Sequence, residues 1–352
     1  MEAKLSSLAR TLTPSSIQQL SYLAQRCNAV NLAEGFPDFP APPTSKKPQF
    51  LLSVPTSIST VIDQGDEVIL FDPSYETYDA CIRLAGGIPV YVGLDPPQWT
   101  LNSDKLEKSF TEKTKALVLN SPHNPTGKVF NKDELEIIAE TCQRRDVVAV
   151  TDEVYEHITF DNQSHISLAS LPGMQSRTVI TSSLSKTFSV TGWRIGWAVA
   201  PTCIASAVRN IHIRMTDCAP APFQEAALAA LKSPPAYFHH LRRDYESKRD
   251  CIFNLLAKVG FKMQFKAQGS FFVFAQLPES CPLSDVEFVE ELIKQAGVVA
   301  VPGAGFFHSK PCADYASSRY IRFAFCKSED TLAAASVKIS RLVDASGNLK
   351  LF

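Results

Sequence analysis

The sequence predicts an α/β protein with a mostly parallel, doubly wound sheet and a second, smaller α+β domain. Short Val/Ile/Leu-rich runs alternate with amphipathic stretches from about residue 66 onward. After Gly260 the sequence pattern changes, and short apolar runs mix with helices. A length of 352 residues also accommodates two domains that share an interface. We expect residues 48–261 to form the large domain, and residues 1–47 and 262–352 to form the small one.

Five apolar runs are the expected strands of the large domain. Each is short and rich in Val, Ile and Leu, as in a parallel sheet buried on both faces; the runs are Asp66–Phe71, Ile88–Val92, Ala116–Asn120, Val147–Asp152 and Thr178–Ser182. We expect helices between them, including Tyr75–Leu84 and a helix that begins after the capping signal at Asn131. This order places functional groups on loops at the carboxyl ends of the strands.

A long helical stretch at about 234–260 leads into the expected second domain. Helices begin there at Ser284 and near Ser328, and they alternate with short apolar runs at Phe261–Phe265, Phe271–Ala275, Val298–Pro302 and Tyr320–Phe325. Thr44–Thr60 does not fit this pattern, because it contains two prolines and shows no clear period. We therefore expect a loop over Thr44–Thr60.

Composition and charge exclude several classes of protein. Lys plus Arg number 35 and Asp plus Glu number 36, so the basic footprint of a nucleic-acid or membrane-surface protein is absent. No apolar run approaches the ~18 residues that span a bilayer, and the first residues do not resemble a secretory signal. The nine cysteines include no C-x-x-C pair, which indicates reduced thiols, a cytoplasmic protein and no metal site.

The segment 183–197, with the sequence SLSKTFSVTGWRIGW, carries the most specific chemical signal. Lys186 stands just past an expected strand among hydroxyl side chains, and Arg194 follows in a Gly-Trp frame. A partly buried lysine with a lowered pKa can form a Schiff base with an aldehyde cofactor, and hydroxyls with an arginine can bind a phosphate monoester. The alternative is a surface lysine and a structural arginine on a loop, but the whole string favours a cofactor site.

This string resembles the cofactor-lysine signature of the fold-type I, class I/II pyridoxal-phosphate (PLP) aminotransferases. Four further segments resemble motifs of that family, in the family's order. They are the substrate loop at Val30–Phe39, an N-x-P-x-N-P-x-G loop at Asn120–Gly127, a D-E-x-Y strand end at 151–155 and a carboxylate-binding strand at Tyr320–Phe323. The resemblance covers about residues 1–43 and 61–345, and it is greatest to the kynurenine, glutamine and methionine aminotransferases.

The resemblance implies a role for each matching residue. Lys186 attaches the cofactor and moves a proton, Asp152 pairs with the pyridine nitrogen, and Arg322 binds the substrate α-carboxylate, assisted by the backbone of Gly35. The implied cofactor-binding residues are Tyr75, Asn124, Asp152, Tyr155, Ser183, Lys186 and Arg194, and the implied substrate-binding residues are Gly35, Asn124 and Arg322. Taken singly, these residues also fit structural alternatives: a turn aspartate, a core tyrosine, an Asn-Pro turn or a salt-bridged arginine.

The implied function is PLP-dependent transamination between an L-amino acid of aromatic, methionine, glutamine or kynurenine type and a 2-oxo acid. The resemblance also implies a cytoplasmic homodimer that acts in amino-acid metabolism and binds neither nucleic acid nor membrane. Two alternatives stay open. One is β-elimination from cysteine conjugates, and the other is a catalytically impaired isoform that only dimerises with full-length subunits.

The chain departs from the family between Pro43 and about Val61. The family carries more chain there, including a core helix, a loop whose N–H groups hold the cofactor phosphate and a segment that reaches the partner subunit. We interpret the difference as an internal deletion near residues 44–60, and we expect weaker phosphate binding and exposed apolar surface. Ile17 and Cys218 stand near positions where the subgroup has aromatic residues on the substrate side.

Overall fold

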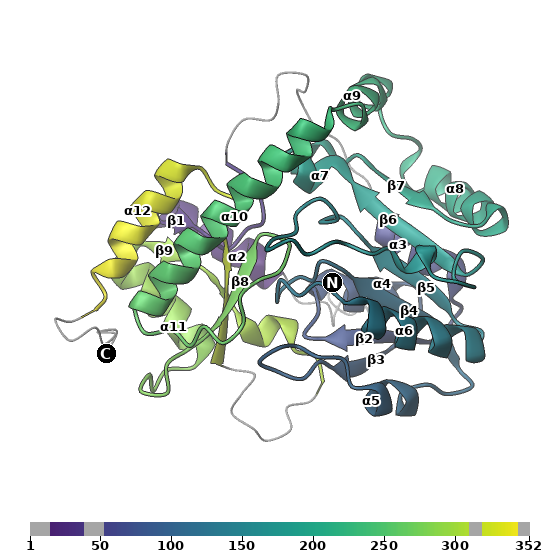
Figure 1. Cartoon of the computed structure of the whole chain (residues 1–352), viewed down its shortest axis with the longest axis horizontal. Helices are drawn as coiled ribbons and strands as arrows, with labels where there is room; N and C mark the ends of the chain where they lie inside the picture. The colour runs from purple at the N-terminus through teal and green to yellow at the C-terminus, as the bar shows by residue number, and fades with distance from the viewer. Residues whose placement is uncertain (1–14, 39–52, 310–318, 344–352) are drawn as a thin grey trace, which may run out of the picture.

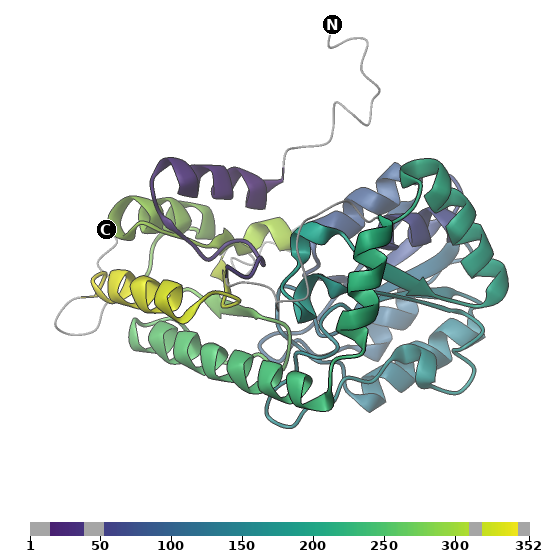
Figure 2. The same cartoon turned by 90° about the horizontal axis from the view of Figure 1, so that it is seen from above.

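The structure is a computed structural model, and it describes residues 15–38, 53–309 and 319–343. Its elements form two groups. Helix α10 (Pro235–Lys258) follows the first group in the chain and leads into the C-terminal part of the second (Figure 1). One group surrounds a six-stranded sheet, and the other combines elements from both ends of the chain (Figure 2). The expected domain boundaries at 47/48 and 261/262 stay a prediction.

The six-stranded sheet contains all five strands that the sequence predicts. They are β2 (Glu67–Asp72), β3 (Ile88–Gly93), β4 (Thr114–Asn120), β5 (Val148–Asp152) and β6 (Thr178–Ser183), followed by β7 (Gly196–Val199). The order across the sheet is β3-β2-β4-β5-β6-β7. The first five strands are parallel and β7 is antiparallel to β6, so the carboxyl ends of β2 to β6 share one edge.

Helices cover both faces of this sheet. One core contains Val68 and Leu70 of β2, under α3 (Ser53–Val61), α4 (Glu76–Leu84) and α8 (Thr202–Thr216). The other core contains Ile69 and Phe71, under α5 (Ser103–Lys108) and α6 (Lys132–Arg144). Successive residues of one strand thus enter opposite cores, as a strand buried on both faces requires. The predicted doubly wound α/β class is confirmed.

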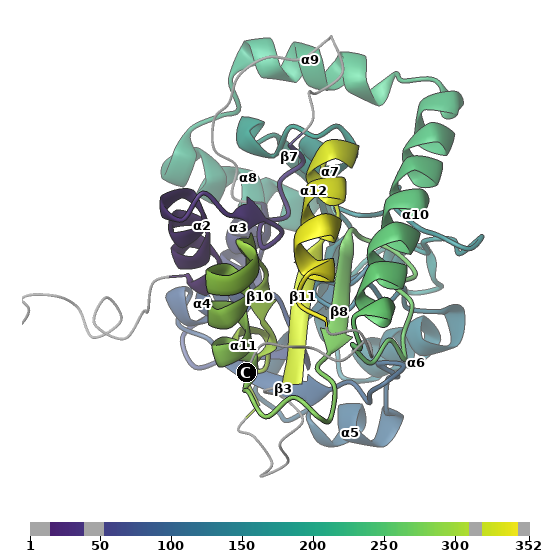
Figure 3. The same ribbon diagram turned by 90° about the vertical axis from the view of Figure 1, so that its left-hand side faces the viewer.

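The second group joins the two ends of the described chain (Figure 3). Strand β1 (Val30–Asn31) pairs in parallel with β9 (Val298–Val299), and β8 (Phe272–Gln276), β11 (Tyr320–Ala324) and β10 (Val301–Pro302) form an antiparallel sheet. The helices of this group are α2 (Ser16–Arg26), α11 (Asp285–Glu291) and α12 (Glu329–Ser340). The apolar run at Phe261–Phe265 forms no strand; only Lys262 makes an isolated bridge, to Gln276.

Helix α3 corrects the interpretation of Thr44–Thr60 as loop. Residues 44–52 lie outside the described residues, but Ser53–Val61 form a helix whose Thr56, Ser57 and Ile58 are fully buried. Pro55 is compatible with this helix because it stands in the first turn, where a backbone N–H has no intrahelical acceptor. Helix α3 packs against α4, α8 and strands β4 to β7, so it buries the part of the sheet beneath it. The internal deletion itself stays a prediction.

Ile58→Ala is expected to destabilise the chain by about 3 kcal/mol, because the Ile58 side chain is 0% exposed in the core under α3. The matched control is Ile88→Ala on β3, since Ile88 is 47% exposed and its truncation should cost less than about 1 kcal/mol. Urea unfolding monitored by circular dichroism measures both. Equal effects of the two substitutions would contradict a buried α3.

The described part of the chain gives two further facts about its environment. None of its helices combines the length and apolar character needed to cross a membrane. Its eight cysteines are all free thiols.

Candidate active site

Most of the residues singled out in the sequence meet at the carboxyl edge of the six-stranded sheet. Tyr75 follows β2, Asn124 follows β4, Asp152 ends β5, and Lys186 lies on the short helix α7 (Leu184–Thr187) directly after β6. Arg322, on β11, comes from the second group and bonds to Asn124. Residues up to 289 positions apart in the chain therefore share one site, because parallel strands end at a common edge and β11 faces it.

The amine of Lys186 is half-buried among apolar and polar groups. Its Nζ donates to the carbonyl oxygen of Gly35 at 3.0 Å and lies 5.5 Å from the ring centre of Phe271 and 5.6 Å from that of Phe36. The pKa of Lys186 is lowered to about 8, chiefly by burial; the positive charges of Arg194 and Arg322 also lower it, whereas Cys326 and Asp152 raise it. Such an amine is mostly neutral above about pH 8, far below the pH that an ordinary lysine needs, and a nucleophile or a proton acceptor must be neutral.

The Asp152 carboxylate lies in the same low-dielectric environment. Burial raises its pKa, and a hydrogen bond from the Tyr78 hydroxyl to Asp152 Oδ2, 2.7 Å long, opposes that rise. The main chain of Asp152 is fixed as well, because Asn120 Nδ2 donates to its carbonyl oxygen at 2.9 Å. Neither Tyr78 nor Asn120 was among the site residues expected from the sequence.

The Arg322 guanidinium is buried without a carboxylate partner among the described residues. It is 1% exposed, and its Nη1 and Nη2 donate to Asn124 Oδ1 and to the Ala33 carbonyl oxygen, each at 2.8 Å. Its Nε is buried and has no hydrogen-bond partner. Its Cζ atom lies 4.2 Å from the ring centre of Phe272 and 4.7 Å from that of Phe306. Burial lowers its pKa to about 10, which is the electrostatic signature of a cation that lacks its anion.

Two neutral donors complete the inner part of the site. The Tyr155 side chain packs edge-on against Phe271 and Phe272, and its hydroxyl has no hydrogen-bond partner within the described ranges. Asn124 uses its side-chain oxygen for Arg322 and its backbone N–H for Asn120 Oδ1, which leaves its amide NH₂ available. Both can donate to an oxygen of a bound molecule.

Ser183 and Arg194 lie on either side of α7. The Ser183 hydroxyl oxygen accepts from the Ser185 N–H and caps α7, so its own proton remains available. Arg194 adopts a left-handed conformation, with φ of 56°, and donates to the Thr191 carbonyl oxygen. The positive charge of Arg194 contributes to the lowered pKa of Lys186.

Tyr75 and Gly35 occupy the two borders of the site. Tyr75 stands at the N-cap position of α4 without a side-chain capping bond, and its ring packs edge-on against Tyr78 at 5.7 Å. A Cβ atom on Gly35 would lie 2.8 Å from both Phe271 and Phe272, so only glycine fits at this position. The sequence did not point to Phe271 and Phe272 as site residues, because runs of aromatic residues far more often belong to a hydrophobic core than to a functional site.

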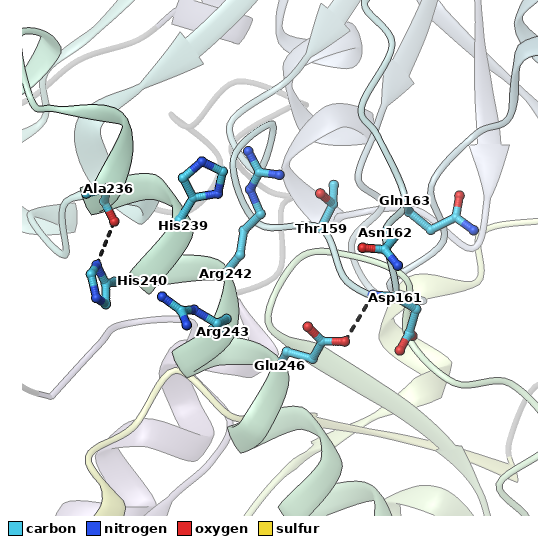
Figure 4. A pocket seen from close by; sticks show the side chains of 10 residues that line it. All are labelled: Thr159, Asp161, Asn162, Gln163, Ala236, His239, His240, Arg242, Arg243 and Glu246. Atoms are coloured by element: carbon cyan, nitrogen blue, oxygen red, sulfur yellow. Dashed lines mark hydrogen bonds between the residues drawn. The ribbon is translucent and has the colours of Figure 1, made fainter.

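A separate cavity of about 520 Å³ lies between the first turns of α10 and the loop at residues 159–163 (Figure 4). No residue expected in the site lines it. Its two carboxylates already have an ion-pair partner, because the buried Arg249 pairs with both Asp161 and Glu246. The cavity therefore does not extend the site around Lys186.

The family model that matches this chain is that of class I and II aminotransferases, over residues 54–339. The chain is a class I and II aminotransferase by family. It is 37% identical over 315 residues to human kynurenine–oxoglutarate transaminase 1, which covers 81% of this chain and 74% of that protein. With human kynurenine–oxoglutarate transaminase 3 it shares 35% identity over 305 residues, 79% of this chain, and it spans only 66% of that protein, just under two thirds.

Solved structures agree with this assignment. The N-succinyldiaminopimelate aminotransferase of Mycobacterium tuberculosis superposes with a TM-score of 0.88 at 32% identity, covering 96% of this chain and 100% of that one. The predicted fold type and reaction class of this aminotransferase are therefore confirmed. Members of the class I and II family depend on PLP, and they move an amino group between an amino acid and a 2-oxo acid.

Proposed function

We propose that this aminotransferase itself binds PLP through Lys186 and transaminates an amino acid and a 2-oxo acid. The observation that carries the proposal is the Lys186 amine, whose pKa is lowered to about 8 and which bonds to a carbonyl oxygen instead of a carboxylate. A lysine in a structural ion pair would have its pKa raised. The lowered value instead favours reaction with an aldehyde.

The side chains of the site fit the functional groups of PLP. Asp152 would face the pyridine nitrogen, Asn124 and Tyr155 the ring oxygen, Tyr75 the ring face, and Ser183 with Arg194 the phosphate; Lys186 would hold the aldehyde carbon. When bound, PLP supplies an aldehyde that takes up an amino group and a ring that stabilises negative charge on the amino acid Cα.

The residues of the chain then position the substrate and move one proton. Arg322 would bind the α-carboxylate, because its Nε has no hydrogen-bond partner and the neighbouring rings of Phe272 and Phe306 supply no anion. The substrate amine would displace Lys186, and the free Lys186 Nζ would take the proton from Cα. A pKa near 8 suits this exchange at physiological pH.

An aromatic, methionine, glutamine or kynurenine-type amino acid is the proposed donor. Aromatic side chains surround the two cations of the site, among them Phe36, Phe272 and Phe306. Phe36 is 50% exposed, so it offers an apolar surface to a side chain that enters from solvent. The names of the two human relatives support an amino donor of the kynurenine type.

A homodimer and a cytoplasmic location are part of the proposal. Helices α8 and α9 (Ala221–Leu231) contain no buried residue, and exposed Ile213, Met215, Leu228 and Leu231 form much of their apolar surface. A second copy of this chain is the proposed cover for that surface, as in the family. The free thiols of the described cysteines support a reducing compartment.

An assay of purified protein with PLP, an aromatic or methionine donor and 2-oxoglutarate tests the function. We expect glutamate and the donor's 2-oxo acid in equal amounts, and no turnover without 2-oxoglutarate. Pyruvate and ammonia released from a cysteine conjugate without any oxo acid would favour the β-lyase alternative. Failure to retain PLP through gel filtration would contradict the proposal and favour the impaired isoform.

A further inference from the structure

Tyr78 is a buried tyrosine of α4 for which neither the sequence motifs nor the proposed mechanism gives a role. It is 4% exposed, and its hydroxyl donates to Asp152 Oδ2 at 2.7 Å across 74 positions of the chain. Burial raises the pKa of the Tyr78 phenol well above its ordinary value, so the phenol keeps its proton and acts only as a donor to the carboxylate.

The two oxygens of the Asp152 carboxylate accept hydrogen bonds of different length from different donors. Oδ2 accepts the short bond from Tyr78, whereas Oδ1 accepts a longer one, 3.3 Å, from the backbone N–H of Val154. A carboxylate has about four acceptor positions, so these two bonds leave room for a further N–H donor. The Tyr78 bond also favours the ionised form of the Asp152 carboxyl, whereas burial favours the protonated form.

We propose that Tyr78 is a positioning residue for the cofactor: it fixes the rotation of the Asp152 carboxylate and keeps it ionised toward the pyridine nitrogen of PLP. The inference rests on the proposed function, which places Asp152 at that nitrogen, and adds that Tyr78 acts through Asp152. A purely structural role is the competing explanation, because Tyr78 also packs against Tyr75 at 5.7 Å.

Tyr78→Phe, which removes one oxygen and keeps the ring, separates the two explanations. We expect the variant to bind PLP about tenfold more weakly than the unmodified chain, measured by absorbance titration of the apo protein. Tyr91→Phe is the matched control. Like the Tyr78 hydroxyl, the Tyr91 hydroxyl donates to a carboxylate, but its partner is Asp79 of α4, away from the site. The control should change PLP affinity less than about twofold.

A ring analogue identifies the route of the effect. In 1-deazapyridoxal 5′-phosphate a carbon replaces the ring nitrogen, so we expect Tyr78→Phe and the unmodified chain to bind it equally. In an Asp152→Asn background, Tyr78→Phe should likewise cause no further loss of PLP affinity.

Three results would overturn the inference: an equal loss for both cofactors, a loss that persists in the Asp152→Asn background, or no loss with PLP. The first two would assign Tyr78 to packing and leave the proposed function standing. If the unmodified chain binds neither cofactor, the proposed function itself fails, and this inference fails with it.

Discussion

Lys186→Ala is expected to abolish transamination, with a loss of at least about 10³-fold in kcat. The substitution removes both the amine that would attach PLP and the base that would take the Cα proton, and general-base catalysis alone contributes about 10²–10⁴-fold. The measurement is glutamate formation from the preferred donor and 2-oxoglutarate, with PLP in excess so that weak binding does not mask the chemical defect.

Lys327 provides the matched control for this experiment. Its Nζ donates to the carbonyl oxygen of Phe36, the residue after the one that accepts from Lys186, and Lys327 is buried. Lys327→Ala loosens the same loop but removes no group from the proposed chemistry, so we expect less than about a tenfold loss. Comparable losses in the two variants would contradict a special role for Lys186.

The pH dependence of PLP capture follows from the same amine. Only neutral Lys186 reacts with the aldehyde, and its pKa in the folded chain is lowered to about 8. The second-order rate of capture by the apo chain should therefore rise about tenfold per pH unit below pH 8 and level off above it. Stopped-flow absorbance measures this, and a rise that continues past pH 10 would show an unperturbed lysine.

Arg322→Gln is expected to lower kcat/KM for the amino acid by about 100- to 1,000-fold, mainly through a higher KM. Loss of one partner from a buried, hydrogen-bonded charge pair costs about 2–5 kcal/mol. PLP affinity should change less than KM, since Arg322 reaches the groups assigned to PLP only through Asn124, at the ring oxygen, and its other bond is to the Ala33 carbonyl oxygen.

Two comparisons make the Arg322 result specific. An amine without an α-carboxylate, such as phenylethylamine, should react equally slowly with Arg322→Gln and the unmodified chain. Arg319→Gln is the control variant, because Arg319 is similarly buried next to the same strand but donates to the main-chain carbonyls of Leu283 and Pro278. Arg319→Gln should lower the stability of the chain and leave KM unchanged. A raised KM in Arg319→Gln would contradict a specific role of Arg322 in binding the carboxylate.

The sequence predicted the elements whose pattern is local. The strands of the six-stranded sheet are continuous apolar runs, and α6 and α11 begin at complete capping boxes, at Asn131 and Ser284, that can be read within four residues. Helix α3 was missed because prolines outweighed its apolar positions, although Pro55 falls in a turn that tolerates proline.

The sequence predicted those residues of the candidate site that stand in motifs. Lys186, Asp152, Asn124 and Arg322 stand in segments with a recognisable spacing, and the fold brings them together. Tyr78 was missed because its partner is 74 positions away and nothing in the sequence around α4 separates it from a core tyrosine. The sequence also could not predict that Arg322 Nε is buried without a hydrogen-bond partner, because this depends on which residues surround it in three dimensions.

Borohydride reduction of the PLP-treated chain, followed by digestion and mass spectrometry, tests the central claim most directly. The reduced bond is stable, so the label reports which amine held the aldehyde. We expect a pyridoxyl phosphate group on the peptide that contains Lys186 and none on the peptide that contains Lys327. A label on any other lysine, with Lys186 unmodified, would contradict it.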